Sequence, residues 1–170
     1  MDELLYDGRF VRLLKRNDWE FAERPNIEGI VLVIPITDDD CLIFNEQFRI
    51  PVGKPVIELP AGLVGDQPGE QGEGLIAGAH RELLEETGYQ ATTMTFLTEG
   101  PPSAGITNEI LTVFIARGCH KVAEGGGVDD EAIIVHKVPV ADAPDWLKQQ
   151  AASGKLIDPK VYIGLYAAIC

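Results

Sequence analysis

The chain contains few basic residues for its length. Its 170 residues include 14 lysines and arginines against 27 aspartates and glutamates, which gives a formal net charge of -13 at pH 7. Proteins that bind nucleic acid or anionic membranes by charge carry basic patches. We therefore expect neither a nucleic-acid partner nor a membrane partner, and a polyanionic substrate would need metal ions or local arginines to be held.

Cysteines and long apolar segments are also scarce. Cys41, Cys119 and Cys170 are odd in number and lack any CxxC or Cys/His spacing, which argues against a disulfide framework and a zinc site. The longest apolar run, "IVLVIPI" from Ile30, is far shorter than a membrane span, and the acidic N-terminus has no apolar core before a cleavage site. These absences predict a cytoplasmic protein with small, buried thiols.

The remaining composition predicts one α/β domain over residues 1–170. Hydrophobic residues make up 45% of the chain, enough to bury one core, and the sequence contains no internal repeat. Short apolar segments predict strands within residues 8–16, 19–24, 29–36, 41–49, 54–62, 93–99, 109–117 and 131–139. The fully apolar segment 29–36 favours a strand buried on both faces, and "TDDD" after it favours a hairpin turn.

Three helices are predicted among these strands. The first spans about residues 75–87 and stops at Gly88, the second lies within 141–154 and is capped by Gly154, and the third lies within 158–169. Asp158 is the expected N-cap of the last helix, with Pro159 at its first position. This order of elements favours a mixed sheet between layers of helices.

The first helix crowds carboxylates onto one side. Glu82, Glu85 and Glu86 are three and four residues apart, so they can converge beside the helix, where like charges repel by a few tenths of a kcal/mol per pair. Magnesium prefers carboxylate oxygens together with waters and substrate phosphates. A metal-phosphate half-site is one interpretation of the cluster, and a solvated acidic helix face is the other.

The spacing around this cluster is more specific than the cluster itself. Six residues form one motif with fixed spacing along the chain: Glu73, Arg81, Glu82, Glu85, Glu86 and Gly88. A chance match has a probability of roughly one in a million per window, since each fixed residue occurs at about one position in ten. The pattern resembles the signature of the Nudix hydrolases, although the leading glycine of that signature falls on Gln67.

This resemblance implies a Nudix-type α/β/α sandwich with a mixed sheet and a magnesium-dependent hydrolysis of a nucleoside diphosphate linked to another group. Two or three Mg²⁺ ions are implied, with Mn²⁺ as a substitute. The implied metal ligands are the Ala61 carbonyl, Glu82, Glu85 and Glu86. Arg81 and Glu85 belong to the implied catalytic set, with Arg81 orienting the glutamates through Glu73 and Glu85.

Four further stretches resemble one branch of the family, the pyrophosphatases of ADP-ribose and related nucleoside diphosphate sugars. They are "EQFRIPVGKPVIELPAG", "DWEFAERP", "PPSAGITNEI" and "EGGGVDDEAIIVHKVP". The implied substrate-binding residues are Trp19, Glu20, Arg24, Arg49, Glu58 and Glu109. Arg49 would contact the diphosphate and Trp19 the nucleobase. A solvated strand-end arginine is the alternative for Arg49, and a core or interface residue is the alternative for Trp19.

Two features of these stretches concern assembly and substrate. In the branch, an N-terminal β arm, here residues 1–28, reaches the partner subunit, so the resemblance implies a homodimer. The third stretch has Ala104 where the branch has a proline between Ser103 and Gly105, a departure that weakens the choice of substrate.

The fourth stretch carries the acids Asp129, Asp130 and Glu131 in a glycine-rich segment. In the branch a glutamate of this loop serves as the base or as an extra metal ligand, and the longer arm of Glu131 favours it over the two aspartates. A solvated turn is the alternative for each of the three.

The sequence thus predicts a pyrophosphatase that splits ADP-ribose or a related nucleotide sugar into a nucleoside monophosphate and a sugar phosphate. One alternative is the same chemistry on GDP-mannose or ADP-glucose. Another, from a different class, is a module that binds ADP-ribose as a sensor without cleaving it.

Overall fold

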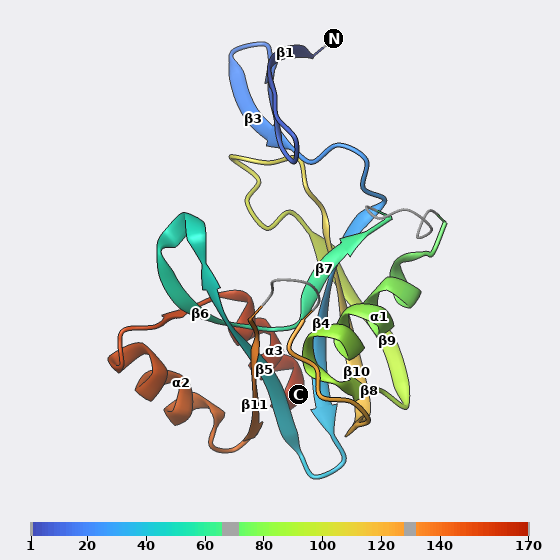
Figure 1. Cartoon of the computed structure of the whole chain (residues 1–170), viewed down its shortest axis with the longest axis vertical. Helices are drawn as coiled ribbons and strands as arrows, with labels where there is room; N and C mark the ends of the chain where they lie inside the picture. Colours follow the sequence, from blue (N-terminus) through green and yellow to red (C-terminus); the bar gives the residue numbers. More distant parts are fainter. Residues whose placement is uncertain (1, 66–71, 128–131, 170) are drawn as a thin grey trace.

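The computed structural model describes residues 2–65, 72–127 and 132–169 (Figure 1). They form a three-stranded sheet and a nine-stranded sheet. The small sheet contains β1 (Glu3–Asp7), β2 (Arg12–Arg16) and β3 (Trp19–Glu23), all antiparallel. Figure 1 shows it as an arm that stands apart from the main body.

The large sheet contains β4 (Gly29–Thr37), β5 (Cys41–Arg49), β6 (Lys54–Glu58), β7 (Ala61–Val64), β8 (Tyr89–Gln90), β9 (Thr93–Gly100), β10 (Leu111–Lys121), β11 (Ile134–Pro139) and β12 (Leu156–Ile157). Its order is β12-β6-β5-β4-β10-β8, with β11 paired to β5, β7 to β4 and β9 to β10. The pairs β10/β4 and β12/β6 are parallel and the others are antiparallel. The predicted mixed sheet is therefore confirmed.

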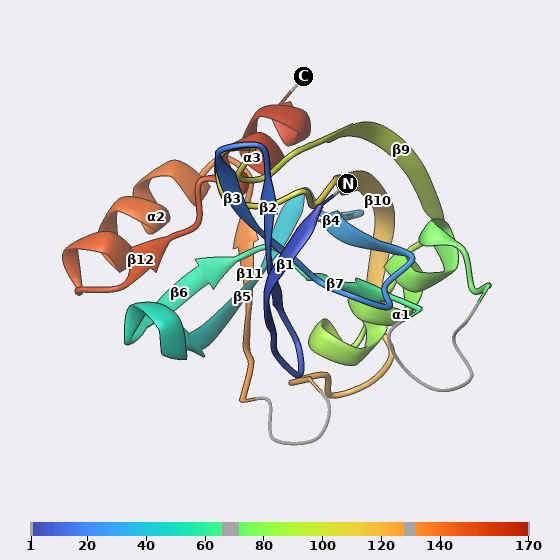
Figure 2. The same cartoon turned by 90° about the horizontal axis from the view of Figure 1, so that it is seen from above.

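Helices cover both faces of this sheet (Figure 2). They are α1 (Leu75–Thr87), α2 (Ala143–Ala152) and α3 (Lys160–Ile169), and a 3₁₀ turn spans Ile50–Val52. In β4, Val31 and Val33 pack in a cluster with Leu83 of α1, whereas Leu32 and Ile34 pack in a second cluster with residues of α2 and α3. Successive strand residues face opposite sides. The apolar run is thus buried on both faces, as predicted, and the architecture is the expected α/β sandwich.

Gly88 ends α1 because no other residue fits there. Its φ is 74°, in the left-handed region, and a Cβ at this position would lie 2.1 Å from the Ala123 carbonyl oxygen. Its amide donates to the Leu84 carbonyl. The predicted helix stop is confirmed, and it fixes the end of the helix that carries the acidic cluster.

Four strands, β1, β7, β8 and β12, were not predicted, and the first predicted strand, within residues 8–16, begins only at Arg12. Residues 8–11 form a bend in which Gly8 N donates to Val11 O, and β1 precedes it. All five residues of β1 are exposed, so no alternation of burial marks that strand. The strand β7 follows directly after Pro60, at the end of the segment 54–62, for which one strand was predicted and not two. The two-residue strands β8 and β12 are too short to give a pattern.

The arm is held to the body through residues 105–109. Ala22 N donates to Ile106 O at 2.7 Å, and Trp19 Nε1 donates to Gly105 O at 3.3 Å. Arg24 pairs with Glu109 at 2.7 Å. These contacts place the end of the arm beside the edge of the large sheet.

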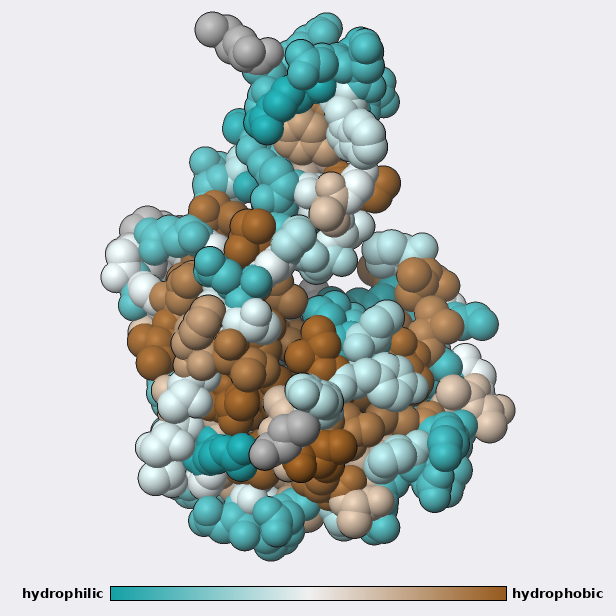
Figure 3. All heavy atoms as spheres, turned by 180° about the vertical axis from the view of Figure 1, so that it is seen from behind, coloured by the Kyte–Doolittle hydropathy of each residue, from teal (hydrophilic) through white to brown (hydrophobic). Residues whose placement is uncertain are grey.

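The back of the body exposes apolar side chains. Figure 3 shows them gathered over β9 and α3, where Phe96, Tyr166 and Ile169 are exposed. The opposite side of α3, with Val161 and Ala167, is buried against the core. No helix in the described parts of the chain has the length and apolar content needed to cross a membrane.

Cys41 and Cys119 are buried and form no disulfide, as expected for structural thiols. Burial raises the pKa of the Cys119 thiol to about 11. Cys170 lies outside the described residues.

Candidate active site

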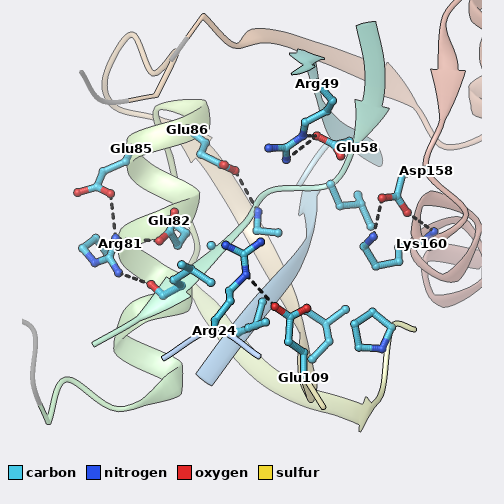
Figure 4. A pocket seen from close by; sticks show the side chains of 17 residues that line it. Arg24, Arg49, Glu58, Arg81, Glu82, Glu85, Glu86, Glu109, Asp158 and Lys160 are labelled. Atoms are coloured by element: carbon cyan, nitrogen blue, oxygen red, sulfur yellow. Dashed lines mark hydrogen bonds and ion pairs between the residues drawn. The ribbon is translucent and has the colours of Figure 1, made fainter. Parts of the chain in front are cut away.

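A pocket of about 510 Å³ opens between α1, the β6–β7 segment and the beginning of α3 (Figure 4). Its wall is unusually rich in charge. The ionisable residues that line it are Arg24, Arg49, Arg81, Lys160, Glu58, Glu82, Glu85, Glu86, Glu109 and Asp158. Six carboxylates thus face four basic groups around one cavity.

Glu86 is the most buried of the pocket acids, with 7% of the residue exposed. Its Oε2 accepts hydrogen bonds from Asn45 Nδ2 at 2.8 Å and from the backbone N–H of Ala61 at 3.0 Å. A buried carboxylate is costly unless donors satisfy it. Because β5 and β7 supply these donors, the sheet fixes the position of Glu86 on the helix.

Arg81 connects the other acids of the helix. Its Nη1 donates to Glu82 Oε1 at 2.9 Å and to Glu85 Oε2 at 3.0 Å, its Nε to Glu73 Oε1 at 3.2 Å, and its Nη2 to the Leu63 carbonyl at 3.0 Å. Burial lowers the pKa of Arg81, but the bonds to Glu73 and the nearby Glu82 and Glu85 outweigh it and raise the pKa above its ordinary value. Arg81 therefore stays charged and holds the acidic wall together.

Two further ion pairs line the pocket beyond α1. Arg49 Nη2 lies 2.7 Å from Glu58 Oε2, and Arg24 Nε lies 2.7 Å from Glu109 Oε1. Burial raises the pKa of Glu58, although Arg49 acts in the opposite direction. Each arginine is oriented by a carboxylate, and because a guanidinium has five N–H donors it can also donate to a second anion.

Residues 28–158 match the NUDIX domain family. The match covers well over half of the chain and includes α1 with its glutamates. The chain belongs to the Nudix family. The resemblance drawn from the spacing of Glu73, Arg81 and the three glutamates is thereby confirmed.

Curated relatives of this Nudix chain include two proteins from Bacillus. A methanol dehydrogenase activator of Bacillus methanolicus is 31% identical over 170 residues, which cover 96% of this chain and 87% of the relative. An ADP-ribose pyrophosphatase of Bacillus subtilis is 38% identical over 130 residues, 76% of this chain and 66% of the relative. A solved structure titled "Crystal structure of ADP compounds hydrolase" superposes with a TM-score of 0.66 at 21% identity, covering 87% of this chain and 80% of that one. This last likeness supports the fold.

The donor set of the Nudix helix suits a hard divalent cation. Glu82, Glu85 and Glu86 all line the pocket, and carboxylate oxygens are the ligands that Mg²⁺ prefers. Asn45 Oδ1, buried beside Glu86, accepts no hydrogen bond within the described chain. A water bound near the glutamates would satisfy that oxygen. The chemistry of these residues therefore fits a hydrated Mg²⁺.

The described residues nevertheless include no group of three acidic, His or Cys side chains arranged to hold a metal ion. Arg81 lies between Glu82 and Glu85 and draws both carboxylates to itself. The contacts expected of Arg81 with Glu73 and Glu85 are present. The assignment of the Ala61 carbonyl and of the three glutamates as metal ligands stays a prediction.

The predicted substrate residues divide into two groups. Arg24, Arg49, Glu58 and Glu109 line the pocket, and their role in binding substrate stays a prediction. Trp19 and Glu20 are exposed on the arm and are not among the lining residues. The remaining predicted positions, Gln67, Asp129, Asp130 and Glu131, lie outside the described residues. Ala104 is in an exposed turn before the Arg24 partner Glu109.

Sequence reasoning missed two residues that line the pocket, Asp158 and Lys160, and one that supports it, Asn45. Asn45 interrupts the apolar first half of β5, and a buried polar residue in such a strand is a signal of a specific partner, here Glu86. Asp158 was recognised as a helix cap, and its carboxylate does accept from Lys160 N at 2.8 Å. That Asp158 and Lys160 also line the pocket follows from tertiary packing.

Gly62→Ala is expected to lower kcat about 10- to 100-fold while leaving the fold intact. A Cβ at Gly62 would lie 2.0 Å from Glu82 Cδ. The end of a glutamate side chain can move away, so the free energy of unfolding should change by only about 1 kcal/mol, whereas a misplacement of about 1 Å in an active site can cost 100-fold in rate.

Gly100→Ala is the matched control for this substitution, because a Cβ there meets nothing within 4 Å. Steady-state kinetics and urea unfolding of both variants test the expectation. Full activity in Gly62→Ala would show that the position of Glu82 does not matter for turnover.

Proposed function

We propose that this protein hydrolyses the diphosphate bond of ADP-ribose or a related nucleoside diphosphate sugar, with Mg²⁺, to give a nucleoside monophosphate and a sugar phosphate. The observation that carries the proposal is the pocket itself. One wall bears the glutamates of α1, and the wall beyond it bears Arg24 and Arg49. Such a division suits a substrate whose diphosphate lies between metal ions and basic side chains.

Each group has a separate task in the proposed reaction. Glu82, Glu85 and Glu86 would hold Mg²⁺, which supplies charge neutralisation at the diphosphate and a more acidic bound water. Arg49, held by Glu58, donates hydrogen bonds to phosphate oxygens. Arg81 keeps the glutamates in place. We assign the base to the acids of residues 129–131, with Glu131 preferred, on the resemblance alone.

We also propose a cytoplasmic homodimer in which the arm contacts a second copy. The arm exposes apolar side chains, including Tyr6, Phe10 and Trp19, each more than half exposed in the single chain. Contiguous exposed apolar surface favours an interface. Trp19 would reach a nucleobase only across such an interface, since it lies apart from the pocket of its own chain. The exposed side chains of the arm support the proposed dimer and a role for Trp19 in the site of the second copy.

The substrate is tested by measuring nucleoside monophosphate release from a panel of ADP-ribose, ADP-glucose and GDP-mannose with Mg²⁺ or Mn²⁺. ADP-ribose is expected to show the highest kcat/KM, and GDP-mannose or ADP-glucose as the best substrate would establish the nearer alternative. Binding of ADP-ribose without release of AMP would establish the sensor alternative. No turnover of any member of the panel would contradict the proposed hydrolysis.

A further inference from the structure

One end of the pocket, away from α1, is formed by the C-terminal segment (Figure 4). Asp158 and Lys160 lie there beside Arg49 and Glu58. Lys160 Nζ donates to Asp158 Oδ2 at 2.5 Å, and the Lys160 backbone N–H donates to Asp158 Oδ1 at 2.8 Å. One carboxylate therefore caps α3 and fixes the ammonium group at the pocket wall.

Strand pairing places this pair next to the Arg49 pair. β12 runs parallel to β6 with Ile157 opposite Ile57, and Asp158 N donates to Ile57 O at 2.9 Å. Asp158 follows Ile157 as Glu58 follows Ile57, so the two carboxylates occupy neighbouring positions. Burial is the main cause of the raised pKa of Glu58; among the smaller effects, the nearby charge of Asp158 raises this pKa and that of Lys160 lowers it. The two ion pairs form one polar wall.

Lys160 occupies a position on α3 that generally disfavours a positive charge. Lys160 is the first residue of α3, and a helix N-terminus carries partial positive charge that disfavours lysine. Residues that break such a local rule are expected at functional sites. An ammonium group has three N–H donors, and the side chain is 31% exposed, so it presents donors to the pocket in addition to the one used by Asp158.

Lys160 also lies just beyond the part of the chain that matches the family, residues 28–158. The glutamates of α1, Arg49 and Glu58 all lie inside it. Residues that carry chemistry shared by all Nudix proteins should lie within the matched residues 28–158. Residues that recognise the group attached to the diphosphate, which varies among substrates, can lie outside them. Arg24, on the arm side, is the other pocket cation outside that segment.

We propose that the Asp158–Lys160 pair binds the hydroxyl groups of the sugar attached to the nucleoside diphosphate, and so contributes to the choice among nucleotide sugars. This inference rests on the proposed function. A carboxylate accepts from one hydroxyl while an adjacent ammonium donates to the next, a combination that matches neighbouring hydroxyls on a sugar ring. Lys160 is then a substrate-binding residue, and Asp158 both binds the sugar and positions Lys160.

The test compares ADP-ribose with the β-methyl ester of ADP, which keeps the diphosphate and its charge but lacks the sugar. Lys160→Ala is expected to raise KM for ADP-ribose about 10- to 100-fold, the loss expected for hydrogen bonds to a charged group. KM for the methyl ester should stay within about twofold, and kcat on ADP-ribose within about threefold, because the contact is made equally in the ground and transition states.

Two variants separate binding from structure. Lys160→Arg keeps a charged donor and should retain most of the affinity, whereas Lys148→Ala removes an exposed lysine of α2, outside the pocket, and should change nothing. Asp158→Asn keeps a capping oxygen and so preserves α3, yet should also weaken ADP-ribose binding selectively.

An equal rise of KM for both ligands would assign Lys160 to the nucleoside diphosphate and overturn the proposal, as would an unchanged KM for ADP-ribose. Kd values for the same two ligands, measured by calorimetry in EDTA, give the same comparison without turnover. If the unaltered protein binds ADP-ribose but cleaves neither ligand, the proposed hydrolysis fails while the Kd comparison still decides the role of Lys160.

Discussion

Glu86→Gln should reduce turnover of nucleoside diphosphate sugars by on the order of a thousandfold, the largest effect expected of any single substitution in this chain. Loss of a metal ligand removes several kcal/mol of transition-state stabilisation, and each 1.4 kcal/mol is about tenfold in rate. The glutamine can still accept hydrogen bonds from Asn45 and from Ala61 N, which now bond Glu86 Oε2. The loss of activity should therefore occur without loss of the fold.

Thermal unfolding tests whether the loss of activity in Glu86→Gln comes from loss of metal binding. Addition of Mg²⁺ should raise the Tm of the unaltered protein, because a ligand that binds the folded state stabilises it. In Glu86→Gln the Tm without metal should be equal or higher, since a buried charge is removed, and the response to Mg²⁺ should be weak or absent. Glu124→Gln, an exposed glutamate outside the pocket, is the control. Normal turnover in Glu86→Gln would overturn the metal-site assignment.

Arg81→Ala is expected to lower both stability and activity. Removal of this side chain leaves Glu73, Glu82 and Glu85 close together without the cation that they share. Removing one partner of a buried ion pair costs about 3–5 kcal/mol, and the partial exposure of these groups reduces the expected loss to about 2–3 kcal/mol. Turnover should fall about 100-fold, because the glutamates lose their common orientation.

The metal dependence of this loss distinguishes the proposal from a simple structural role. Mg²⁺ neutralises the same carboxylates, so it should restore part of the stability of Arg81→Ala measured by urea unfolding. Arg81→Lys keeps the charge but loses the planar fork that reaches three carboxylates and the Leu63 carbonyl, so an intermediate effect is expected. A variant whose stability does not respond to Mg²⁺ at all would count against metal binding at these glutamates.

The main elements of the body could be predicted because local signals agree with the tertiary fold. The apolar run of β4 predicts a strand buried on both faces, and Gly88 predicts the end of α1, where only glycine fits. β1 and β7 carry no such signal. β1 is exposed along its length, and β7 is defined by its pairing with β4 after Pro60 rather than by a pattern of its own.

The site was predictable where its residues share one helix and less so where they come from distant elements. The spacing of the three glutamates with Arg81 can be read along the chain, and Arg81 does bond Glu73 and Glu85. The contact of Glu86 with Asn45 joins residues 41 positions apart, and Asp158 reaches the pocket through the pairing of β12 with β6. Patterns within a short stretch of sequence do not show that residues so far apart line one cavity.

The position of Trp19 illustrates a different limit. Sequence resemblance assigned it to the nucleobase, yet in the single chain it is 62% exposed on the arm and bonds the Gly105 carbonyl. A residue that acts in the site of a second copy cannot be placed by the fold of one chain. Its role therefore depends on the proposed dimer, which light scattering would detect as twice the mass of one chain.

Product analysis in ¹⁸O-labelled water tests the central claim most directly. With ADP-ribose and Mg²⁺, hydrolysis of the diphosphate bond should give AMP and ribose 5-phosphate in equal amounts, with one ¹⁸O atom incorporated into one of the two phosphates. Release of ADP and free ribose, or no cleavage under any metal condition, would contradict the assignment of this pocket to nucleotide sugar pyrophosphate hydrolysis.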